Sequence, residues 1–437
     1  MKIFFYIKTI LILSILILQS EIYAINLWTR INSPVSTSLF NCTFPDTLNG
    51  WAAGESGIII HSSDGGNSFS VQNTPVNFYT NDIFFCNKRL GWAVANENFF
   101  SGSTFLKTTN GGVNWMSFKF PDSNKVIRSV YFLDSLNGFC GSFTGNIYKT
   151  TNSGFTWNES VVDSGVFNIY PISEIKFISH DTGFACGGQL DIAGVIWKTT
   201  DGGMHWKAGV YSPEPFYDLY FLNSENVIAA GGDFEYGVQI SRTSDCGLNW
   251  NYHSLGIFGQ ARSIDFRTSA EAWMALAFAR TFAVSYDSGY TWTSVPATDS
   301  SELNCVVFAD SLHGWAVGNN GVILKYNKSL VSIQSSQVNS ISENFTLNQN
   351  YPNPFNPVTK IIYSLAENSF IKLKIYNVSG SLVSEMYNGF QTAGKHSITF
   401  NGSEFTSGVY FYKLEVSLPD SKESGKFSDT KKMLLLK

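Results

Sequence analysis

The chain has 437 residues, a formal net charge of -5, a pI near 5.7, 14% charged residues and 15% aromatic residues. This acidic balance, without a long basic run, argues against nucleic acid or an anionic membrane surface as the main partner. The length allows two or three ordinary domains, or one large repeat domain and a small one.

The first 24 residues have the pattern of a signal peptide. Lys2 and Lys8 precede an apolar run over residues 10–18, and a cleavage site follows between Ala24 and Ile25. The run is too short and too close to the terminus for a transmembrane anchor. The sequence therefore predicts an exported protein without such an anchor.

Residues 25–328 contain one unit repeated seven times, at intervals of 41 to 47 residues. Every unit keeps a phenylalanine at the end of its first apolar strand: Phe44, Phe85, Phe132, Phe177, Phe221, Phe266 and Phe308. Apolar strands and polar or glycine turns divide each unit into four short strands. The pattern predicts an all-β chain whose main part is a seven-bladed β-propeller.

The two ends of this repeat region complement each other. The seventh unit stops after its third strand, whereas the segment beginning at residue 25 matches the fourth strands of the other units. We expect Trp28 to supply the missing outer strand of blade seven and so to close the ring.

Six units carry a glycine turn before the fourth strand, as in KTTDGGMHW (198–206). These turns resemble the Asp-box of bacterial neuraminidase repeats. The acidic position is occupied by Asp64, Asn110, Asn152, Asp201, Asp245 and Asp287. Asparagine accepts the same amide hydrogen bonds but cannot act as a general base, so we predict a structural role for all six turns. His205 then stands at an ordinary polar turn position.

Antiparallel blades place the loops between second and third strands on the opposite face, where we expect a ligand. These loops offer Phe99, Phe100, Asp191, Asp233, Glu235 and Tyr236. Four residues before each repeated phenylalanine stand Phe40, Asn81, Arg128, Ser173, Tyr217, Arg262 and Asn304, and Asp82, Glu174 and Asp218 follow three of them.

From this set we predict a site for a sugar or an extended peptide. Its residues are Arg128, Arg262, Asp82, Glu174, Asp218, Tyr217, Asp191, Asp233, Glu235 and Tyr236. The alternative is that they are solvated rim residues and inter-blade hydrogen-bonding groups. No cofactor and no metal site are expected.

The six cysteines permit disulfides in an oxidising compartment but show no framework, since 15 pairings are possible. We expect small buried side chains with at most one pair. No CxxC or zinc-ligand spacing is present in the sequence.

Strings such as VFADSLHGWAVGNNGVILK (307–325) and GWAAGESGIIIHSSDGGNSF (50–69) resemble the photosystem II stability and assembly factor-like propellers. This resemblance covers about residues 25–328 and implies a role in protein binding or assembly. The family's basic arginine patch is not matched, which puts a photosynthetic role in doubt. The arginines of the repeat region are spread over different turns and strands: Arg30, Arg89, Arg128, Arg242, Arg262, Arg267 and Arg280.

Sialidases and xyloglucanases also carry Asp-boxes, so a secreted glycoside hydrolase is the alternative to a binding module. A sialidase resemblance requires three arginines, for which Arg128, Arg262 and Arg280 are available, but the Arg-Ile-Pro motif is absent. Another glycosidase needs two carboxylates about 5–10 Å apart, and the spacing of Asp191, Asp233 and Glu235 singles out no pair. We therefore predict a non-enzymatic protein- or glycan-binding module.

After a Ser-rich linker at residues 329–344, residues 345–437 form about seven alternating strands, which predicts a small Ig-like β-sandwich. YPNPFNP (351–357), SGVYFY (407–412) and the Lys-rich, Leu-ended tail resemble the type A sorting domain of the type IX (Por) secretion system. That resemblance implies recognition by the outer-membrane translocon. The protein is then expected to be secreted or attached at the cell surface.

Overall fold

The computed structural model describes residues 27–98, 102–163, 169–327, 345–366, 369–391, 394–417 and 427–437. It divides the chain into two compact units, with the boundary between residues 328 and 329. The predicted signal peptide with its Ala24–Ile25 cleavage site, the linker at residues 329–344, Phe99 and Phe100 lie outside the described residues.

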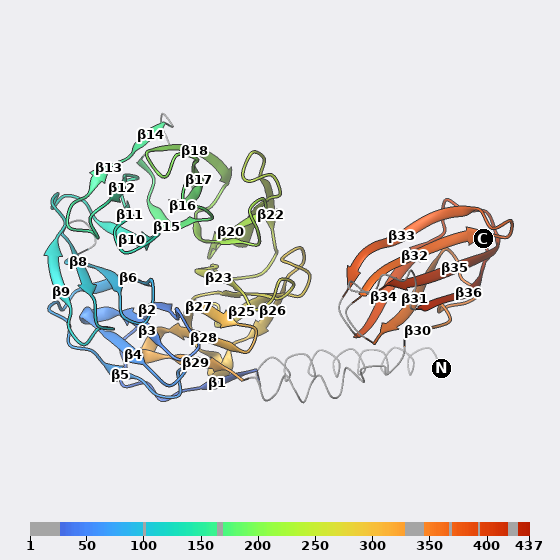
Figure 1. The fold of residues 1–437 in the computed structure, drawn as a ribbon, viewed down its shortest axis with the longest axis horizontal. Helices are drawn as coiled ribbons and strands as arrows, with labels where there is room; N and C mark the ends of the chain where they lie inside the picture. The colour runs from blue at the N-terminus through green and yellow to red at the C-terminus, as the bar shows by residue number, and fades with distance from the viewer. Residues whose placement is uncertain are drawn as a thin grey trace. The chain divides into compact units, whose positions relative to one another are not determined.

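The first unit is a ring of seven β-sheets around a central axis, which confirms the seven-bladed propeller (Figure 1). The first three blades, each written from the inner to the outer strand, are β2 (Leu39–Thr43), β3 (Gly50–Gly54), β4 (Ile59–Ser62) and β5 (Ser70–Val71); β6 (Tyr79–Phe85), β7 (Gly91–Asn96), β8 (Ser103–Thr108) and β9 (Met116–Lys119); and β10 (Ile127–Phe132), β11 (Gly138–Ser142), β12 (Ile147–Thr150) and β13 (Asn158–Glu159).

The next three blades follow the same order. They are β15 (Ile172–Phe177), β16 (Gly183–Gln189), β17 (Ala193–Thr199) and β18 (His205–Ser212); β19 (Phe216–Phe221), β20 (Val227–Asp233), β21 (Gly237–Thr243) and β22 (Asn251–Ser254); and β23 (Ser263–Phe266), β24 (Ala272–Ala275), β25 (Thr281–Ser285) and β26 (Thr293–Pro296).

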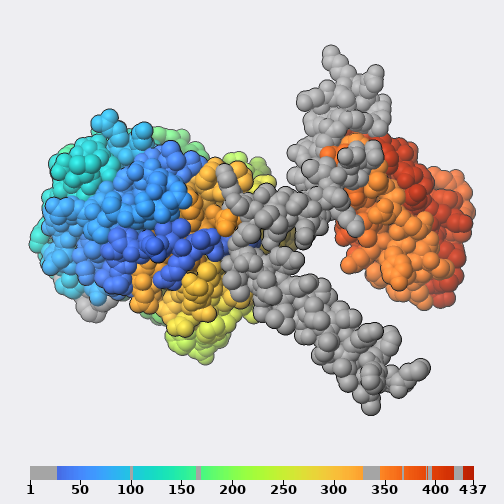
Figure 2. Space-filling model, turned by 90° about the horizontal axis from the view of Figure 1, so that it is seen from below, coloured from blue at the N-terminus to red at the C-terminus, as the bar shows by residue number. Residues whose placement is uncertain are grey.

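The seventh blade contains both ends of the propeller. Its own strands are β27 (Leu303–Asp310), β28 (His313–Gly318) and β29 (Ile323–Tyr326), and its outer strand is β1 (Trp28–Arg30). β1 pairs antiparallel with β29, with Trp28 opposite Tyr326. The dark-blue N-terminal segment accordingly lies against the orange seventh blade in both views (Figures 1 and 2). The predicted closure of the ring by Trp28 is confirmed.

Blade four departs from the predicted four strands because it has a fifth, β14 (Val161–Asp163), which pairs parallel with β18. The outer strand of blade three, β13, is only two residues long. The chain then crosses to the next blade, where Ser160 Oγ donates to the Gly203 carbonyl at 2.7 Å and Val161 N donates to the Met204 carbonyl at 2.9 Å. This crossing joins blades three and four along their outer edges.

The repeated aromatic residues hold neighbouring blades together. Phenylalanines stack on the tryptophan of the preceding blade in three places, with ring centroids 3.7 Å apart for Phe85 and Trp51, 3.6 Å for Phe132 and Trp92, and 3.5 Å for Phe44 and Trp315. Each of these indoles also donates to a carbonyl in the Asp-box turn of the following blade: Trp51 to Gly111, Trp92 to Ser153 and Trp315 to Gly65. The repeat therefore encodes the blade-to-blade contact as well as the blade.

The Asp-box of blade four shows how the turn is made. Thr199 Oγ1 accepts the Gly203 amide, and Asp201 Oδ1 accepts the amides of Met204 and His205, all at 3.0 Å. His205 Nδ1 lies 2.7 Å from Asp201 Oδ2. Slight burial raises the pKa of Asp201, but these hydrogen bonds outweigh it and lower the pKa to about 2. The carboxylate is occupied by its own turn.

Glycine at the fifth position of the Asp-box is required by the neighbouring blade. Gly66 has a positive φ of 76°, and a Cβ there would lie 2.1 Å from Trp315 Nε1. Gly256 has a similar φ of 64° with nothing within 4 Å of its Cβ position. We expect Gly66→Ala to lower the free energy of unfolding by about 1–3 kcal/mol more than Gly256→Ala in urea denaturation, since both share the φ cost. Equal losses would contradict the packing argument.

The second unit is a β-sandwich of two sheets, as predicted. One sheet contains β30 (Thr346–Leu347), β31 (Val358–Leu365) and β34 (Gly394–Asn401), and the other contains β33 (Leu382–Gln391), β32 (Ser369–Asn377), β35 (Gly408–Ser417) and β36 (Phe427–Leu435). Buried residues of both sheets form one core. Phe355 of the YPNPFNP motif is part of this core and donates its amide to the Leu434 carbonyl at 2.9 Å. The motif is therefore joined to the last strand.

Candidate functional site

A cavity of about 1100 Å³ lies at the centre of the propeller, lined by the inner strands of all seven blades. All seven predicted ring residues line it: Phe40, Asn81, Arg128, Ser173, Tyr217, Arg262 and Asn304. Glu55 and Phe143, from loops between second and third strands, also line it, whereas none of the six Asp-box residues does. We call the end with the ring residues the mouth.

A repeated β-bulge positions these ring residues. In six of the seven described inner strands the register with the next strand shifts by one residue, and the skipped residues are Phe40, Asn81, Arg128, Ser173, Tyr217 and Asn304. Successive residues of a regular strand point to opposite faces, and a bulge re-aims one of them. In five of these strands the following residue therefore lines the cavity too.

The mouth carries two arginines around a tyrosine. The Arg262 guanidinium carbon lies 4.8 Å from the centre of the Tyr217 ring, and that of Arg128 lies 5.7 Å from the centre of the Phe143 ring. Desolvation lowers the pKa of both arginines, and the charge of Arg262 lowers that of Arg128 further. Among the residues that the structure describes, neither guanidinium has a hydrogen-bond or ion-pair partner, so their donors are available to a ligand.

Asp82 lines the cavity, yet its carboxylate is used between blades. It accepts the Val130 amide at 2.7 Å, the Ile83 amide at 2.8 Å and the side-chain amide of Asn41. Burial raises its pKa to about 6 despite these donors. Asp82 thus makes the kind of hydrogen bond between blades that was the alternative to a ligand-binding role.

Asp218, three blades further around the ring, has a similar arrangement. Its oxygens accept the amides of Leu219 at 2.7 Å and Ile264 at 2.9 Å, and Lys176 Nζ donates to it at 2.6 Å. Asp265, which the sequence analysis missed, accepts the Phe308 amide at 2.7 Å, and burial raises its pKa to about 7. Asp265 could have been found from the sequence, because it is an acidic residue directly before the repeated Phe266.

Of the three predicted carboxyl groups that line the cavity, Glu174 is the one whose oxygens remain available. It is partly exposed and lines the cavity, and no described residue donates a hydrogen bond to it. Burial raises its pKa well above the usual value; Lys176 opposes this, and the charges of Asp82 and Asp218 add to it. A protonated Glu174 can donate a hydrogen bond into the cavity.

The other four predicted residues do not line the cavity. Asp191, Asp233 and Glu235 form a separate cluster from blades four and five, and Tyr236 beside it is 61% exposed. Arg280, considered as a third arginine, pairs with Glu302 at 3.0 Å and is not among the lining residues. The ten residues predicted as one site thus divide into six that line the cavity and four that lie outside it.

All six cysteines are free thiols. Cys42 of blade one and Cys305 of blade seven nevertheless bring their sulfur atoms to 3.5 Å across the junction that closes the ring. If the single pair allowed by the sequence forms, these are the residues placed to form it.

Two known families match parts of the chain, one in each compact unit. The family described as photosynthesis system II assembly factor YCF48 matches residues 20–170, and the secretion system C-terminal sorting domain matches residues 349–424. The protein is thus an exported β-propeller, found at the cell surface or secreted. More particularly, its N-terminal part is similar to the YCF48 family, and its C-terminal part is similar to secretion sorting domains, which implies contact with the secretion machinery. The described part of the chain contains no helix with the length and apolar character of a membrane span.

Solved structures share the propeller fold at low sequence identity. YCF48 from Cyanidioschyzon merolae has a TM-score of 0.57 and 18% identity, covering 69% of this chain and 99% of that chain. YCF48 bound to D1 peptide has a TM-score of 0.55 and 20% identity, covering 69% and 97%. The Niastella koreensis GH74 enzyme has a TM-score of 0.52 and 12% identity, covering 92% and 74%. No curated protein sequence matches the chain.

Proposed function

We propose that the propeller is a binding module that captures a carboxylate-bearing segment of another protein at the mouth of its central cavity. The observation that carries this proposal is the pair of guanidinium groups, Arg128 and Arg262, that have no partner among the described residues and lie beside Tyr217. Arginine binds carboxylates through two parallel hydrogen bonds, and these two guanidinium groups can offer such donors at the mouth.

The size and lining of the cavity give room for a segment of a polymer. Its volume of about 1100 Å³ lies at the upper end of the usual range of ligand pockets, about 300–1000 Å³. Phe40 and Tyr79 add aromatic surface to the lining. The fold neighbour YCF48 bound to D1 peptide is a precedent for peptide binding by such a propeller. An acidic glycan is the other ligand class that the arginines could accept.

The hydrolase alternative, suggested by fold neighbours such as the GH74 xyloglucanase from Xanthomonas campestris, receives less support. A glycosidase needs two carboxyl groups about 5–10 Å apart, one of them often acting as a general acid. Asp82 and Asp218 line the cavity, but their oxygens accept backbone amides of the neighbouring blades. Glu55 accepts the Ser38 amide at 3.2 Å and Asp265 the Phe308 amide at 2.7 Å. Every described lining carboxylate other than Glu174 is therefore already hydrogen-bonded to the protein backbone.

The test compares peptides that differ only in a carboxylate. We expect the mature protein to bind a subset of immobilised peptides with free C-terminal or acidic side-chain carboxylates, and Arg128→Gln and Arg262→Gln each to weaken that binding about tenfold or more. Arg89→Gln is the matched control, because Arg89 is exposed on the Asp-box face. Affinity unchanged in the double variant would refute the proposal, as would glycan turnover that disappears in Glu174→Gln.

A further inference from the structure

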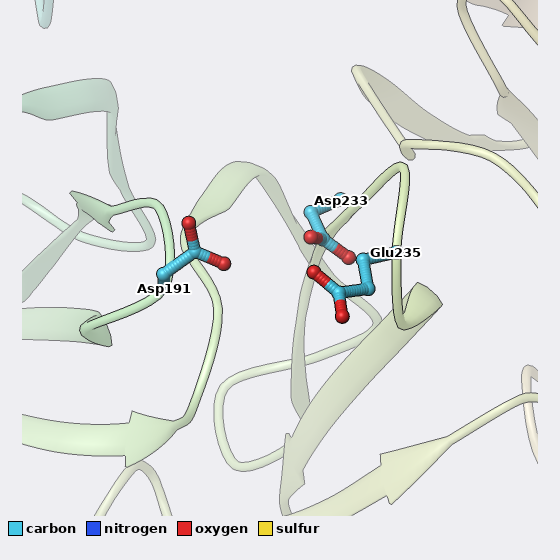
Figure 3. Close-up of side chains that lie close together, drawn as sticks. All are labelled: Asp191, Asp233 and Glu235. Carbon is cyan, nitrogen blue, oxygen red and sulfur yellow. The ribbon is translucent and has the colours of Figure 1, made fainter.

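Three carboxylates meet on the loop face where blades four and five adjoin. Asp191 lies in the loop between β16 and β17, Asp233 ends β20, and Glu235 follows in the turn to β21 (Figure 3). One oxygen of each residue lies within 4.8 Å of an oxygen of both others. The three groups thus converge from two different blades.

Asp233 shows that the cluster is more than three surface charges. Its side chain is fully buried, and its Oδ1 accepts the Tyr236 amide at 2.6 Å. Its Oδ2 is buried without a hydrogen-bond partner among the described residues. Figure 3 shows the carboxylates of Asp233 and Glu235 side by side. A buried carboxylate oxygen without a donor or a cation is costly, so this one calls for a partner that the protein itself does not supply.

A fourth carboxylate adds to the negative charge. Glu214 is 2% exposed, and its Oε2 accepts the Asp191 amide at 2.9 Å. Burial raises the pKa of Glu214; the Asp191 amide opposes this, and the charges of Asp233, Asp191 and Glu235 raise the pKa further. In the described part of the chain, none of these four carboxylates forms an ion pair with Lys, Arg or His.

We propose that Asp191, Asp233 and Glu235 bind a calcium ion that joins the loops of blades four and five. Calcium takes six to eight oxygen ligands at about 2.3–2.6 Å, so two oxygens on opposite sides of the ion are about 4.8 Å apart. The oxygens of the cluster already lie within that span. Magnesium requires oxygens at about 2.0–2.1 Å in near-octahedral geometry, which oxygens up to 4.8 Å apart fit less well. Water supplies the remaining ligands on the exposed side.

The site is connected to the mouth by one side chain. Gln260 Nε2 donates to Tyr217 Oη at 2.7 Å and to the Gly232 carbonyl at 3.3 Å, and Gly232 directly precedes Asp233. An ion held by Asp233 therefore steadies the backbone to which Tyr217 is tied. Calcium binding itself does not depend on the proposed function.

The test adds Ca²⁺ alone to the full mature chain after removal of metals with a chelator. Isothermal titration is expected to show one saturable Ca²⁺ per chain, and Ca²⁺ is expected to raise the Tm of the propeller because it binds the folded state only. Asp233→Asn and Glu235→Gln should each weaken Ca²⁺ binding tenfold or more. Glu225→Gln is the matched control and should leave binding unchanged, because Glu225 is an exposed carboxylate in a turn of the Asp-box face.

Glu235→Gln keeps the test decisive if Asp233→Asn fails to fold, because Glu235 is exposed and accepts no hydrogen bond from a described residue. Loss of the Ca²⁺ response in Glu235→Gln, with an unchanged Tm in the absence of metal, supports the site. A wild-type chain without saturable binding up to about 10 mM Ca²⁺, well above the affinity range of extracellular calcium modules, overturns it. A response to Mg²⁺ equal to that of Ca²⁺ overturns the assignment of the ion.

Discussion

Trp28→Ala is expected to lower the free energy of unfolding of the whole propeller by about 3–5 kcal/mol, the usual cost of deleting a buried large aromatic side chain. Trp28 stands in a strand of only three residues but is 3% exposed. It contacts four aromatic rings of blades six and seven, with centroids 5.5 Å away for Trp273, 5.0 Å for Phe282, 5.8 Å for Phe308 and 5.4 Å for Tyr326. Because β1 closes the ring, its loss should affect every blade.

Urea denaturation followed by tryptophan fluorescence measures this effect on the propeller alone, since all 11 tryptophans lie between residues 28 and 315. Trp28→Phe is the matched control. It keeps an aromatic ring and removes an indole N–H that is buried without a partner in the described part of the chain. We expect it to cost less than half as much. An unchanged unfolding midpoint in Trp28→Ala would contradict ring opening. If a protease then cleaved the variant only at its N-terminal segment, the substitution would have frayed that end alone.

Removal of residues 345–437 should abolish surface display and secretion and leave the folded propeller in the periplasm. The propeller and the sandwich are separate compact units with separate cores, so the truncated propeller should keep its fold. The YPNPFNP motif is anchored in the sandwich core through Phe355, and this core is deleted with it. Cell fractionation, protease shaving of intact cells and immunoblotting measure the distribution.

Two controls separate sorting from folding. Residues 345–437 fused to an unrelated periplasmic protein should carry that protein to the surface. Tyr351→Ala changes a motif residue that is 79% exposed and so leaves the core intact. Reduced export of this variant would place recognition on the exposed part of the motif. Undiminished surface display of the truncated propeller would show that the sandwich is not the sorting signal.

The propeller fold could be predicted because the sequence repeats the same four-stranded unit seven times. In a single unit, Phe85 and Trp92 do not reveal whether they belong to a repeated strand pattern. Seven units at similar spacing show that an apolar side chain recurs at these two positions. The closing strand was visible for the same reason, since Trp28 matches a strand that the seventh unit lacks. The sorting domain was recognisable from short motifs whose residues, such as Phe355, prove to be part of its core.

The rest could not be predicted because it depends on contacts between distant residues. β14 pairs with β18 of blade four, where Val161 lies opposite His205, and Ser160 beside it donates to the Gly203 carbonyl 43 residues away. Asp82 and Glu174 follow the ring residues in the same way, yet only Asp82 meets a donor from another blade, the Val130 amide 48 residues away. The split of the ten predicted residues into a cavity group and a carboxylate cluster depends likewise on how loops of two blades meet.

The repeated bulge at the mouth has a consequence for how such a protein can be altered. A skipped residue has no partner in the strand register, so the pairing of the strands does not itself determine which side chain stands there. The chain itself shows this tolerance, because one backbone geometry carries Phe40, Asn81, Arg128, Ser173, Tyr217 and Asn304. Asn304 donates to the Leu39 carbonyl of the next blade and Tyr217 accepts from Gln260, whereas the side chains of Asn81, Arg128 and Ser173 form no hydrogen bond with a described residue. Randomising these three positions is therefore expected to change the surface of the mouth while the blades keep the residues that fold them.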